Sequence, residues 1–574
     1  MSTAKNTGEL PLRFAAKLTR MANASYESGE MADRVTLVTR DLLRFWFSDT
    51  FTETRKFNFH DGQKQAILNT LFAHEVLKSK NVFDMYALAD SDALAEMGTG
   101  EIAQKKYACS KYCIKMATGT GKTWVMHALL LWQYLNAKYA EAGGAPPECV
   151  FSKNFLLVAP GLIVYERLLD AFLGKETDDG TRSFETSDYH VFRELFIPDG
   201  YKNAAFGFIQ NAVAKKDEIG KKVTGDGVIA VTNWHLLAGD GSETETADSS
   251  DPAAIVKDLL PITPGTTAGH SLKSLDSKFF SGAERDCLAR LPDLVVINDE
   301  AHHIHETKTE GYADEVEWQK SLTVIAQGKG EKFIQVDFSA TPDSETGNGQ
   351  KRVKQYFPHI VVDFDLKTAI HKGLVKTTVL DKRKELASEQ LADLDFRAER
   401  DEDGRPVALS EGQKIMLRAG LAKLRILETQ FAALSPGTDK CPKMLAICED
   451  TAVSPLVIAY LTQFEGLADE DVVQIDSDKK GSIPAPEWQS IKRTLFSVDR
   501  RKTPKVIVSV LMLREGFDVN NICVIVPLRR SQSDHLLEQI VGRGLRLMWR
   551  GEEYESIKAE NRERLLVKKQ EPSN

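Results

Sequence analysis

Seven short runs of apolar residues recur along this chain, with segments of helical composition between them. Most runs are continuous and do not alternate with polar residues, which is typical of strands buried on both faces of a parallel sheet. Intervening segments such as 124–139 and 162–172 have the length of helices. This alternation predicts an α/β fold with parallel sheets. The runs lie at 112–115, 155–158, 228–231, 294–297, 333–336, 506–508 and 524–526.

Composition narrows the class of protein further. The 574 residues carry a formal net charge of -9, with 42% hydrophobic and 27% charged residues, so we expect a soluble globular chain. No apolar run approaches the roughly 20 residues of a membrane-spanning helix, and the N-terminus lacks the apolar stretch of a signal peptide. Seven cysteines, an odd number, favour a reducing compartment. A cytoplasmic protein without membrane contact is therefore predicted.

Changes of composition divide the chain into five predicted regions. Charged, Ser/Thr-rich or Pro/Gly-containing stretches mark the boundaries. The regions are a helical N-terminal extension (1–55), a first α/β lobe (56–378) with an acidic surface insertion (239–251), a charged connector with a helix (379–440), a second α/β lobe (441–550) and a charged tail (551–574).

A glycine-rich loop, MATGTGKT at 116–123, lies between a predicted strand and a predicted helix. In this context such a loop binds phosphate, because its glycines let backbone N–H groups approach the anion. The lysine would reach the β- and γ-phosphates, and the threonine after it would hold Mg²⁺. Met116 replaces the usual first glycine, and the alternative is an ordinary turn. The predicted phosphate-binding residues are Thr118, Gly119, Thr120, Gly121, Lys122 and Thr123.

Two adjacent acids follow the predicted strand at 294–297. A strand that ends in carboxylates presents them at the carboxyl edge of the sheet, where open α/β sheets bind ligands. Asp299 would share the Mg²⁺ with Thr123, and Glu300 would orient or deprotonate an attacking water. Taken alone, a strand followed by Asp-Glu is common, so the assignment depends on the phosphate loop.

From about residue 57 to 550 the chain resembles the superfamily 2 helicases. The segment FNFHDGQKQAI at 57–67 resembles their adenine-recognition element, with Gln63 in the recognising position but without the usual Arg-x-Tyr. Val158-Ala159-Pro160 resembles motif Ia. In VTNWH at 231–235, which resembles motif Ib, the resemblance implies that Thr232 and Asn233 contact the nucleic-acid backbone.

Three further segments carry the resemblance towards the C-terminus. SATP at 339–342 resembles motif III, which implies that Ser339 and Thr341, together with His302, couple hydrolysis to movement. REGFD at 514–518 resembles motif V, and it implies that Asp518 belongs to the nucleotide site. QIVGRGLR at 539–546 resembles motif VI.

The segment at 539–546 also supports a prediction that does not depend on the resemblance. Gln539, Arg543 and Arg546 are spaced four and three apart, which places them on one face if the segment is helical. Forked guanidinium groups suit the spread charge of a phosphoryl-transfer transition state. We therefore predict that the three residues act in catalysis, although a basic helix end paired with surface acids is the alternative.

The segment 492–550 is basic within an acidic chain. It contains twelve Lys and Arg residues and five acids, which gives +7 against -9 overall. Local positive charge of this kind is typical of a groove that follows a phosphate backbone. Arg529 and Arg530 are the predicted nucleic-acid contacts, and a solvated charged face is the alternative. No base-reading motif is evident, so we expect no sequence preference.

Within superfamily 2, the phosphate loop and motifs Ib, III, V and VI resemble those of the helicase (Res) subunit of type III restriction enzymes. The resemblance implies two RecA-like lobes that bind ATP and Mg²⁺ and move on DNA in a restriction or phage-defence system, with duplex DNA as the expected substrate. A modification, specificity or nuclease subunit is an expected partner. Only 28 residues follow motif VI, so we expect a motor without its nuclease domain.

Three alternatives remain open at this point. The chain could be an RNA helicase, because the Asp-Glu-Ala-His tetrad also occurs there. It could be an ATP-dependent clamp or assembly module that binds nucleotide but moves nothing. It could also be an inactive remnant of a larger restriction enzyme.

Overall fold

The computed structural model divides the chain into two compact units. One consists of Met1–Ala117 and Gly121–Asp365, and the other of Thr118–Thr120 and Leu366–Asn574. The sequence predicted the end of the first lobe at 378 and a charged connector at 379–440 before the second lobe. The described residues are 7–142, 149–159, 162–177, 180–222, 225–233, 285–303, 307–309, 312–314, 317–346, 353–377, 379, 394–434, 440–475, 498, 501–510, 519–528, 541–542, 544–549 and 559–560. The predicted insertion at 239–251 therefore lies outside them.

A seven-stranded sheet forms the centre of the first unit, and every pairing in it is parallel. It contains all five apolar runs that were predicted in this part of the chain. The strands, in spatial order, are β13 (Ile360–Phe364), β1 (Ser110–Met116), β10 (Phe333–Ser339), β7 (Leu294–Asn298), β2 (Asn154–Ala159), β6 (Val228–Asn233) and β5 (Val213–Ala214).

The register of this sheet aligns the ends of the strands that precede the sequence motifs. Lys115 pairs with Ser339, and Asp337 pairs with Asn298. Val158 of β2 lies beside Asn298 on one side and Thr232 on the other. Because all of these strands run in parallel, the loops that follow them start at one edge of the sheet.

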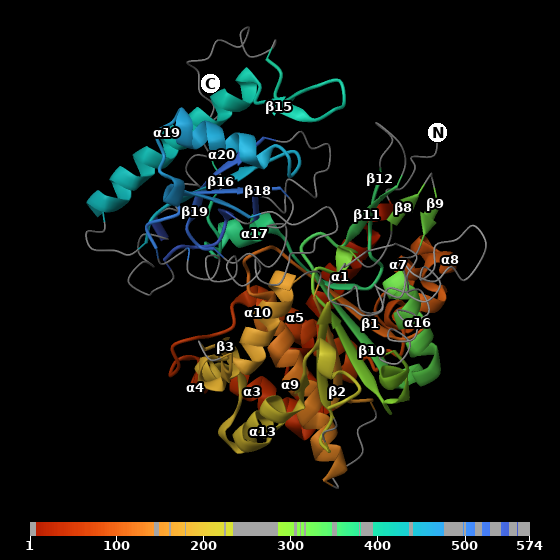
Figure 1. The fold of residues 1–574 in the computed structure, drawn as a ribbon. Coiled ribbons are helices and arrows are strands. Elements are labelled where there is room, and N and C mark those ends of the chain that lie inside the picture. Colours follow the sequence, from red (N-terminus) through yellow and green to blue (C-terminus); the bar gives the residue numbers. More distant parts are fainter. Residues whose placement is uncertain are drawn as a thin grey trace, which may run out of the picture. The chain divides into compact units, whose positions relative to one another are not determined.

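Helices cover both faces of the sheet. Helix α16 (Glu317–Lys329) contributes Trp318 and Leu322 to a core with alternate residues of β2 and β7 and with Phe333 of β10. Helices α5 (Asp61–Leu71), α9 (Lys122–Glu141) and α10 (Leu162–Leu173) lie on the other side of the strands (Figure 1). The predicted helices at 124–139 and 162–172 are confirmed.

Helices also make up most of residues 7–52, which belong to the first unit. The N-cap residue Thr36 accepts a hydrogen bond from the Thr39 amide at 3.1 Å, which starts α3. Trp46 is completely buried and its ring N–H donates to the Phe196 carbonyl at 3.0 Å. The helices are α1 (Leu10–Glu27), α2 (Glu30–Arg34), α3 (Leu37–Phe47) and α4 (Asp49–Thr52).

Shorter elements complete the first unit. The helices are α6 (Val82–Ala89), α7 (Ser91–Met97), α8 (Thr99–Ile102), α11 (Asp188–Val191), α12 (Arg193–Phe196) and α13 (Lys202–Ala212). Antiparallel hairpins are formed by β3 (Lys175–Glu176) with β4 (Arg182–Ser183), β8 (Thr307–Thr309) with β9 (Tyr312–Asp314), and β11 (Asp343–Thr346) with β12 (Val353–Tyr356).

The second unit has its own parallel sheet of four strands, which confirms the predicted α/β fold with two RecA-like parallel-sheet lobes. The apolar runs at 506–508 and 524–526 are two of these strands. The elements are α17 (Leu366–His371), the hairpin β14 (Glu399–Arg400) and β15 (Pro406–Ala408), α19 (Glu411–Leu434), β16 (Lys443–Ile447), α20 (Ser454–Gln463), β17 (Val472–Gln474), β18 (Val506–Ser509) and β19 (Ile522–Pro527).

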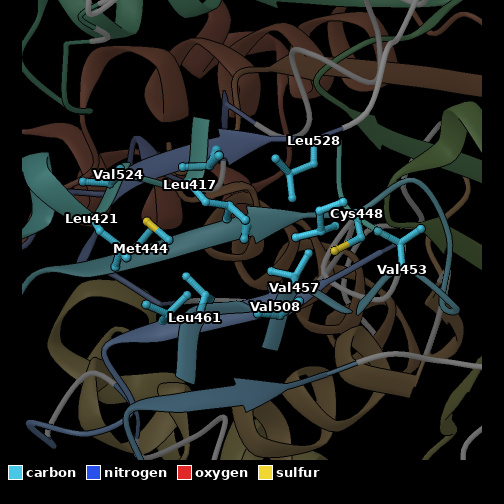
Figure 2. Close-up of a cluster of buried hydrophobic side chains, with 14 of the residues drawn as sticks. Leu417, Leu421, Met444, Cys448, Val453, Val457, Leu461, Val508, Val524 and Leu528 are labelled. Atoms are coloured by element: carbon cyan, nitrogen blue, oxygen red, sulfur yellow. The ribbon is translucent and has the colours of Figure 1, made fainter. Parts of the chain in front are cut away.

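One apolar core joins α19 and α20 to the sheet of the second unit. Leu417 and Leu421 of α19, with Val457 of α20, point toward Met444 and Val508 of the strands (Figure 2). Since the strand members alternate along each strand, they share one face of the sheet. Among the described residues of the whole chain, no helix is long and apolar enough to cross a membrane.

Gly420 lets α19 approach this sheet closely. A Cβ atom there would lie 2.4 Å from the Val526 side chain and 2.8 Å from the Met444 sulfur. We therefore expect Gly420→Val to destabilise the protein by about 1–3 kcal/mol through overpacking. Thermal unfolding measures this, with Lys423→Val, an exposed position on the same helix, as the control. Equal melting temperatures for the two variants would contradict the prediction.

Candidate nucleotide site

The predicted phosphate loop connects the end of β1 to the start of α9. Gly119 and Gly121 have φ angles of +82° and +80°, in the left-handed region that glycine adopts without strain. Gly121 is the N-cap of α9 and has no side chain to cap its first turn. The backbone N–H groups of that turn are therefore suited to an anion, and the helix dipole has the same preference.

Gln63 is joined to this loop by a side-chain hydrogen bond. Its amide group donates to the Gly121 carbonyl at 3.0 Å, and its oxygen accepts from the His60 amide at 3.1 Å as part of a capping box. The side chain is 2% exposed. The structure thus places Gln63 against the phosphate loop, and its predicted role in adenine recognition stays a prediction.

Lys122 and Glu300 are in direct contact. The Lys122 amino group lies 3.1 Å from Glu300 Oε1, and the two side chains are only 11% and 14% exposed. Glu300 has a φ of +48°, which is uncommon for a residue with a side chain. The folded first unit thus brings together the lysine of the phosphate loop and the second of the two acids after β7.

Asp299 begins the turn that follows β7. Its amide donates to the Val158 carbonyl at 3.0 Å, and its carboxylate accepts from the Glu300 amide at 3.0 Å. The Asp299 carboxylate and the Thr123 hydroxyl are hard oxygen donors, which suit Mg²⁺. No group of three or more His, Cys, Asp or Glu side chains that could hold a metal occurs in the described part of the chain. A nucleotide would have to supply further oxygens.

A side-chain contact joins the turn after β7 to the end of β10. His302 Nδ1 lies 2.9 Å from the Ser339 hydroxyl, and 3.8 Å from Glu300 Oε2. The Ser339 hydroxyl also accepts from the Thr341 amide at 3.1 Å. The residues predicted to couple hydrolysis to movement are therefore close to one another and to Glu300. The coupling itself remains a prediction.

The other predicted site residues are less fully described. Thr232 and Asn233 end β6, and the Thr232 side chain is buried. Arg546 follows Leu545, whose carbonyl accepts from the Lys376 amide at 2.6 Å. The predicted residues that lie outside the described part of the chain are Asp518, Arg529, Arg530, Gln539 and Arg543.

Sequence reasoning missed a set of polar side chains behind the acids. Asp337 in β10 and His359 before β13 are both completely buried and lie 2.8 Å apart, from His359 Nε2 to the carboxylate. Asn298 at the end of β7 is also completely buried and donates to Asp337 at 2.7 Å. The available signal was an acid in the middle of an apolar strand, where an unpaired carboxylate would be costly.

A family model described as the res subunit of type III restriction enzymes matches residues 56–344, half of the chain. The chain belongs to this family. The predicted resemblance to the helicase (Res) subunit of type III restriction enzymes is thereby confirmed. The match covers the phosphate loop, the acids after β7 and the Ser-Ala-Thr-Pro segment. No curated protein matches the chain.

Several solved structures show a distant likeness. The Mycobacterium smegmatis helicase Lhr bound to ssDNA and AMP-PNP is 14% identical, with a TM-score of 0.37, over 84% of this chain and 46% of that chain. The Type ISP restriction-modification enzyme LlaBIII bound to DNA is 13% identical, with a TM-score of 0.39, over 87% and 28%.

A fragment of a putative HsdR subunit of a type I restriction enzyme from Vibrio vulnificus YJ016 is 16% identical, with a TM-score of 0.38, over 90% and 67%. The chain thus spans less than half the length of Lhr and of LlaBIII.

Proposed function

We propose that the chain is a nucleic-acid-dependent ATPase that uses hydrolysis to move on duplex DNA. The observation that carries this proposal is the 3.1 Å contact between Lys122 and Glu300. A phosphate-binding lysine and a carboxylate able to activate water are thereby held at one edge of one sheet, as phosphoryl transfer to water requires.

The chemistry follows from the groups around the loop. ATP phosphates bind at the N–H groups that begin α9, and the Lys122 ammonium moves from Glu300 to the phosphate oxygens. Glu300 is then free to accept a proton from the attacking water. Mg²⁺, held by Thr123 and Asp299, would neutralise charge on the phosphates when bound. The first unit thus contributes Glu300, which accepts the proton of the attacking water, and Lys122, which stabilises negative charge on the phosphates.

Residues of the second unit are proposed to complete the reaction and the grip on DNA. Arg543 and Arg546, with Gln539, would stabilise charge on the transferring phosphoryl group. Asp518 would contact the nucleotide. Arg529 and Arg530 would bind the DNA backbone, together with Thr232 and Asn233 of the first unit.

The proposed setting is a restriction or phage-defence system with a modification, specificity or nuclease subunit as partner. Membership of the restriction-enzyme family supports this setting. Since the +7 segment at 492–550 has no base-reading motif, we propose binding that is strongly salt-dependent and independent of sequence.

The direct test is ATP hydrolysis by the purified chain with and without nucleic acid. Duplex DNA is expected to stimulate hydrolysis more than RNA does, and Lys122→Ala is expected to abolish the stimulated rate by removing charge from the phosphates. Displacement of a triplex-forming strand then measures movement. Stronger stimulation by RNA would favour an RNA helicase, and hydrolysis without displacement would favour a clamp. Stimulation that survives Lys122→Ala would contradict the site.

A further inference from the structure

Asp337 is a charged residue at the centre of the first sheet. It is completely buried in β10, between β1 and β7. Its carboxylate accepts hydrogen bonds from Asn298 Nδ2 at 2.7 Å and from Gln335 Nε2 at 2.9 Å, and His359 Nε2 lies 2.8 Å away. A buried carboxylate with these partners gains little stability over an apolar side chain. Its hydrogen bonds do fix geometry.

The geometry that Asp337 fixes is that of the turn after β7. Asp337 and Ser339 alternate on β10, so both face the same side of the sheet. Asp337 binds Asn298 at 2.7 Å, and Ser339 contacts His302 at 2.9 Å. The segment 298–302 is therefore attached at both ends to one face of one strand. Asp299 and Glu300 lie between the two attachments.

Helix α16 determines which way the Asn298 amide faces. The Trp318 ring N–H approaches Asn298 Oδ1 at 3.4 Å. Because an indole nitrogen can only donate, the asparagine oxygen must face Trp318, and its NH₂ group faces Asp337. The Asn298–Asp337 contact is thus an amide donating to a carboxylate, which is stronger than a bond between neutral groups.

Glu300 needs such support. Its φ of +48° lies in the left-handed region, which is strained for a residue with a side chain. A conformation of this kind persists only where neighbouring contacts hold it. We propose that Asp337 is a positioning residue that, through Asn298, holds the Glu300 backbone in this conformation and its carboxylate next to Lys122. This inference rests on the proposed ATPase function.

Exchanging the two partners tests this role. In Asp337→Asn, a neutral amide with one oxygen replaces the carboxylate that accepts from Asn298 and Gln335, so the bond from Asn298 weakens and we expect kcat to fall about tenfold. In Asn298→Asp, two carboxylates meet, and kcat should fall further. The double variant Asn298→Asp with Asp337→Asn rebuilds the hydrogen bond with donor and acceptor exchanged, and it leaves an oxygen for Trp318. It should recover kcat to within about threefold of wild type.

Two further measurements separate positioning from stability. The Kd for a fluorescent ATP analogue is not expected to rise in Asp337→Asn, because the phosphate loop is untouched and a displaced Glu300 would leave the Lys122 charge more available to phosphate. Tyr86→Phe serves as the matched control, since it removes another buried hydrogen bond of the first unit, from Tyr86 to the Pro358 carbonyl at 2.8 Å. Its kcat should equal that of wild type.

The outcomes distinguish this inference from the proposed function. Unchanged kcat in Asp337→Asn, or no recovery in the double variant, would overturn the positioning role while wild-type hydrolysis upholds the function. An equal loss in Tyr86→Phe would also overturn it, because any buried hydrogen bond would then have the same effect. A wild-type chain without DNA-stimulated hydrolysis would overturn both.

Discussion

Glu300→Gln is expected to lower kcat for ATP hydrolysis by about 10²–10⁴-fold, the range that a general base contributes. ATP should meanwhile bind more tightly than to the wild-type chain. The reason is the 3.1 Å contact of Glu300 with Lys122 between two largely buried side chains. Glutamine cannot accept the proton of the attacking water, and it also leaves the Lys122 charge available to phosphate. We expect Kd for ATP to fall by about fivefold, which corresponds to about 1 kcal/mol.

Single-turnover hydrolysis and equilibrium binding of ATP measure these two effects separately. Glu331→Gln is the control, because it breaks the 2.8 Å ion pair between Glu331 and Lys80. The Lys80 side chain is 61% exposed and the Glu331 side chain 59%. Such an exposed pair contributes about 1 kcal/mol or less to stability and is remote from the proposed chemistry. Turnover by Glu300→Gln within tenfold of wild type would remove Glu300 from the role of base.

Gly121→Ala is expected to weaken ATP binding by at least about tenfold, for two reasons that add. At a φ of +80° an alanine is strained, at a cost of about 1–2 kcal/mol. Its Cβ would also lie 2.5 Å from Gln63 Nε2, so the hydrogen bond from Gln63 to the Gly121 carbonyl would have to shift. The first N–H groups of α9 would then be displaced from the phosphates.

Gly207→Ala provides the comparison for this variant. Gly207 lies in α13, and a Cβ there would meet nothing within 4 Å. Alanine is about 1 kcal/mol better than glycine in a helix, so this variant should be slightly more stable and bind ATP normally. Titration with ATP measures the Kd of both variants, and thermal unfolding measures their stability. An unchanged Kd in Gly121→Ala would show that the loop does not bind phosphate in the way proposed.

Much of the fold could be predicted because the relevant signals are local. A run such as 294–297 is apolar at every position, since both faces of its strand are covered, and a sequence shows this directly. The strands β13 and β16 were missed because polar residues interrupt or flank them. Lys443 at the start of β16 is completely buried, with its amino group 2.7 Å from the Arg501 carbonyl and its pKa lowered to about 8 by burial.

The candidate site could be predicted only in part, because only its local patterns are visible in the sequence. The loop at 116–123 and the acids after β7 are contiguous patterns, and their residue types alone indicate phosphate and metal chemistry. The sequence could not show that Lys122 and Glu300, 178 positions apart, touch each other. It also could not show that Gln63 binds the phosphate loop.

The sequence by itself determined the strands that are apolar throughout, and it showed which of them are followed by the phosphate loop and by the acids Asp299 and Glu300. Only the tertiary structure decided the order β1, β10 and β7, which places Asp337 beside Asn298. The physical reason is that hydrogen bonds between parallel strands join residues far apart in the chain. A buried side chain such as that of Asp337 therefore acquires its hydrogen-bond partners only when the sheet has formed, and its structural role depends on those partners.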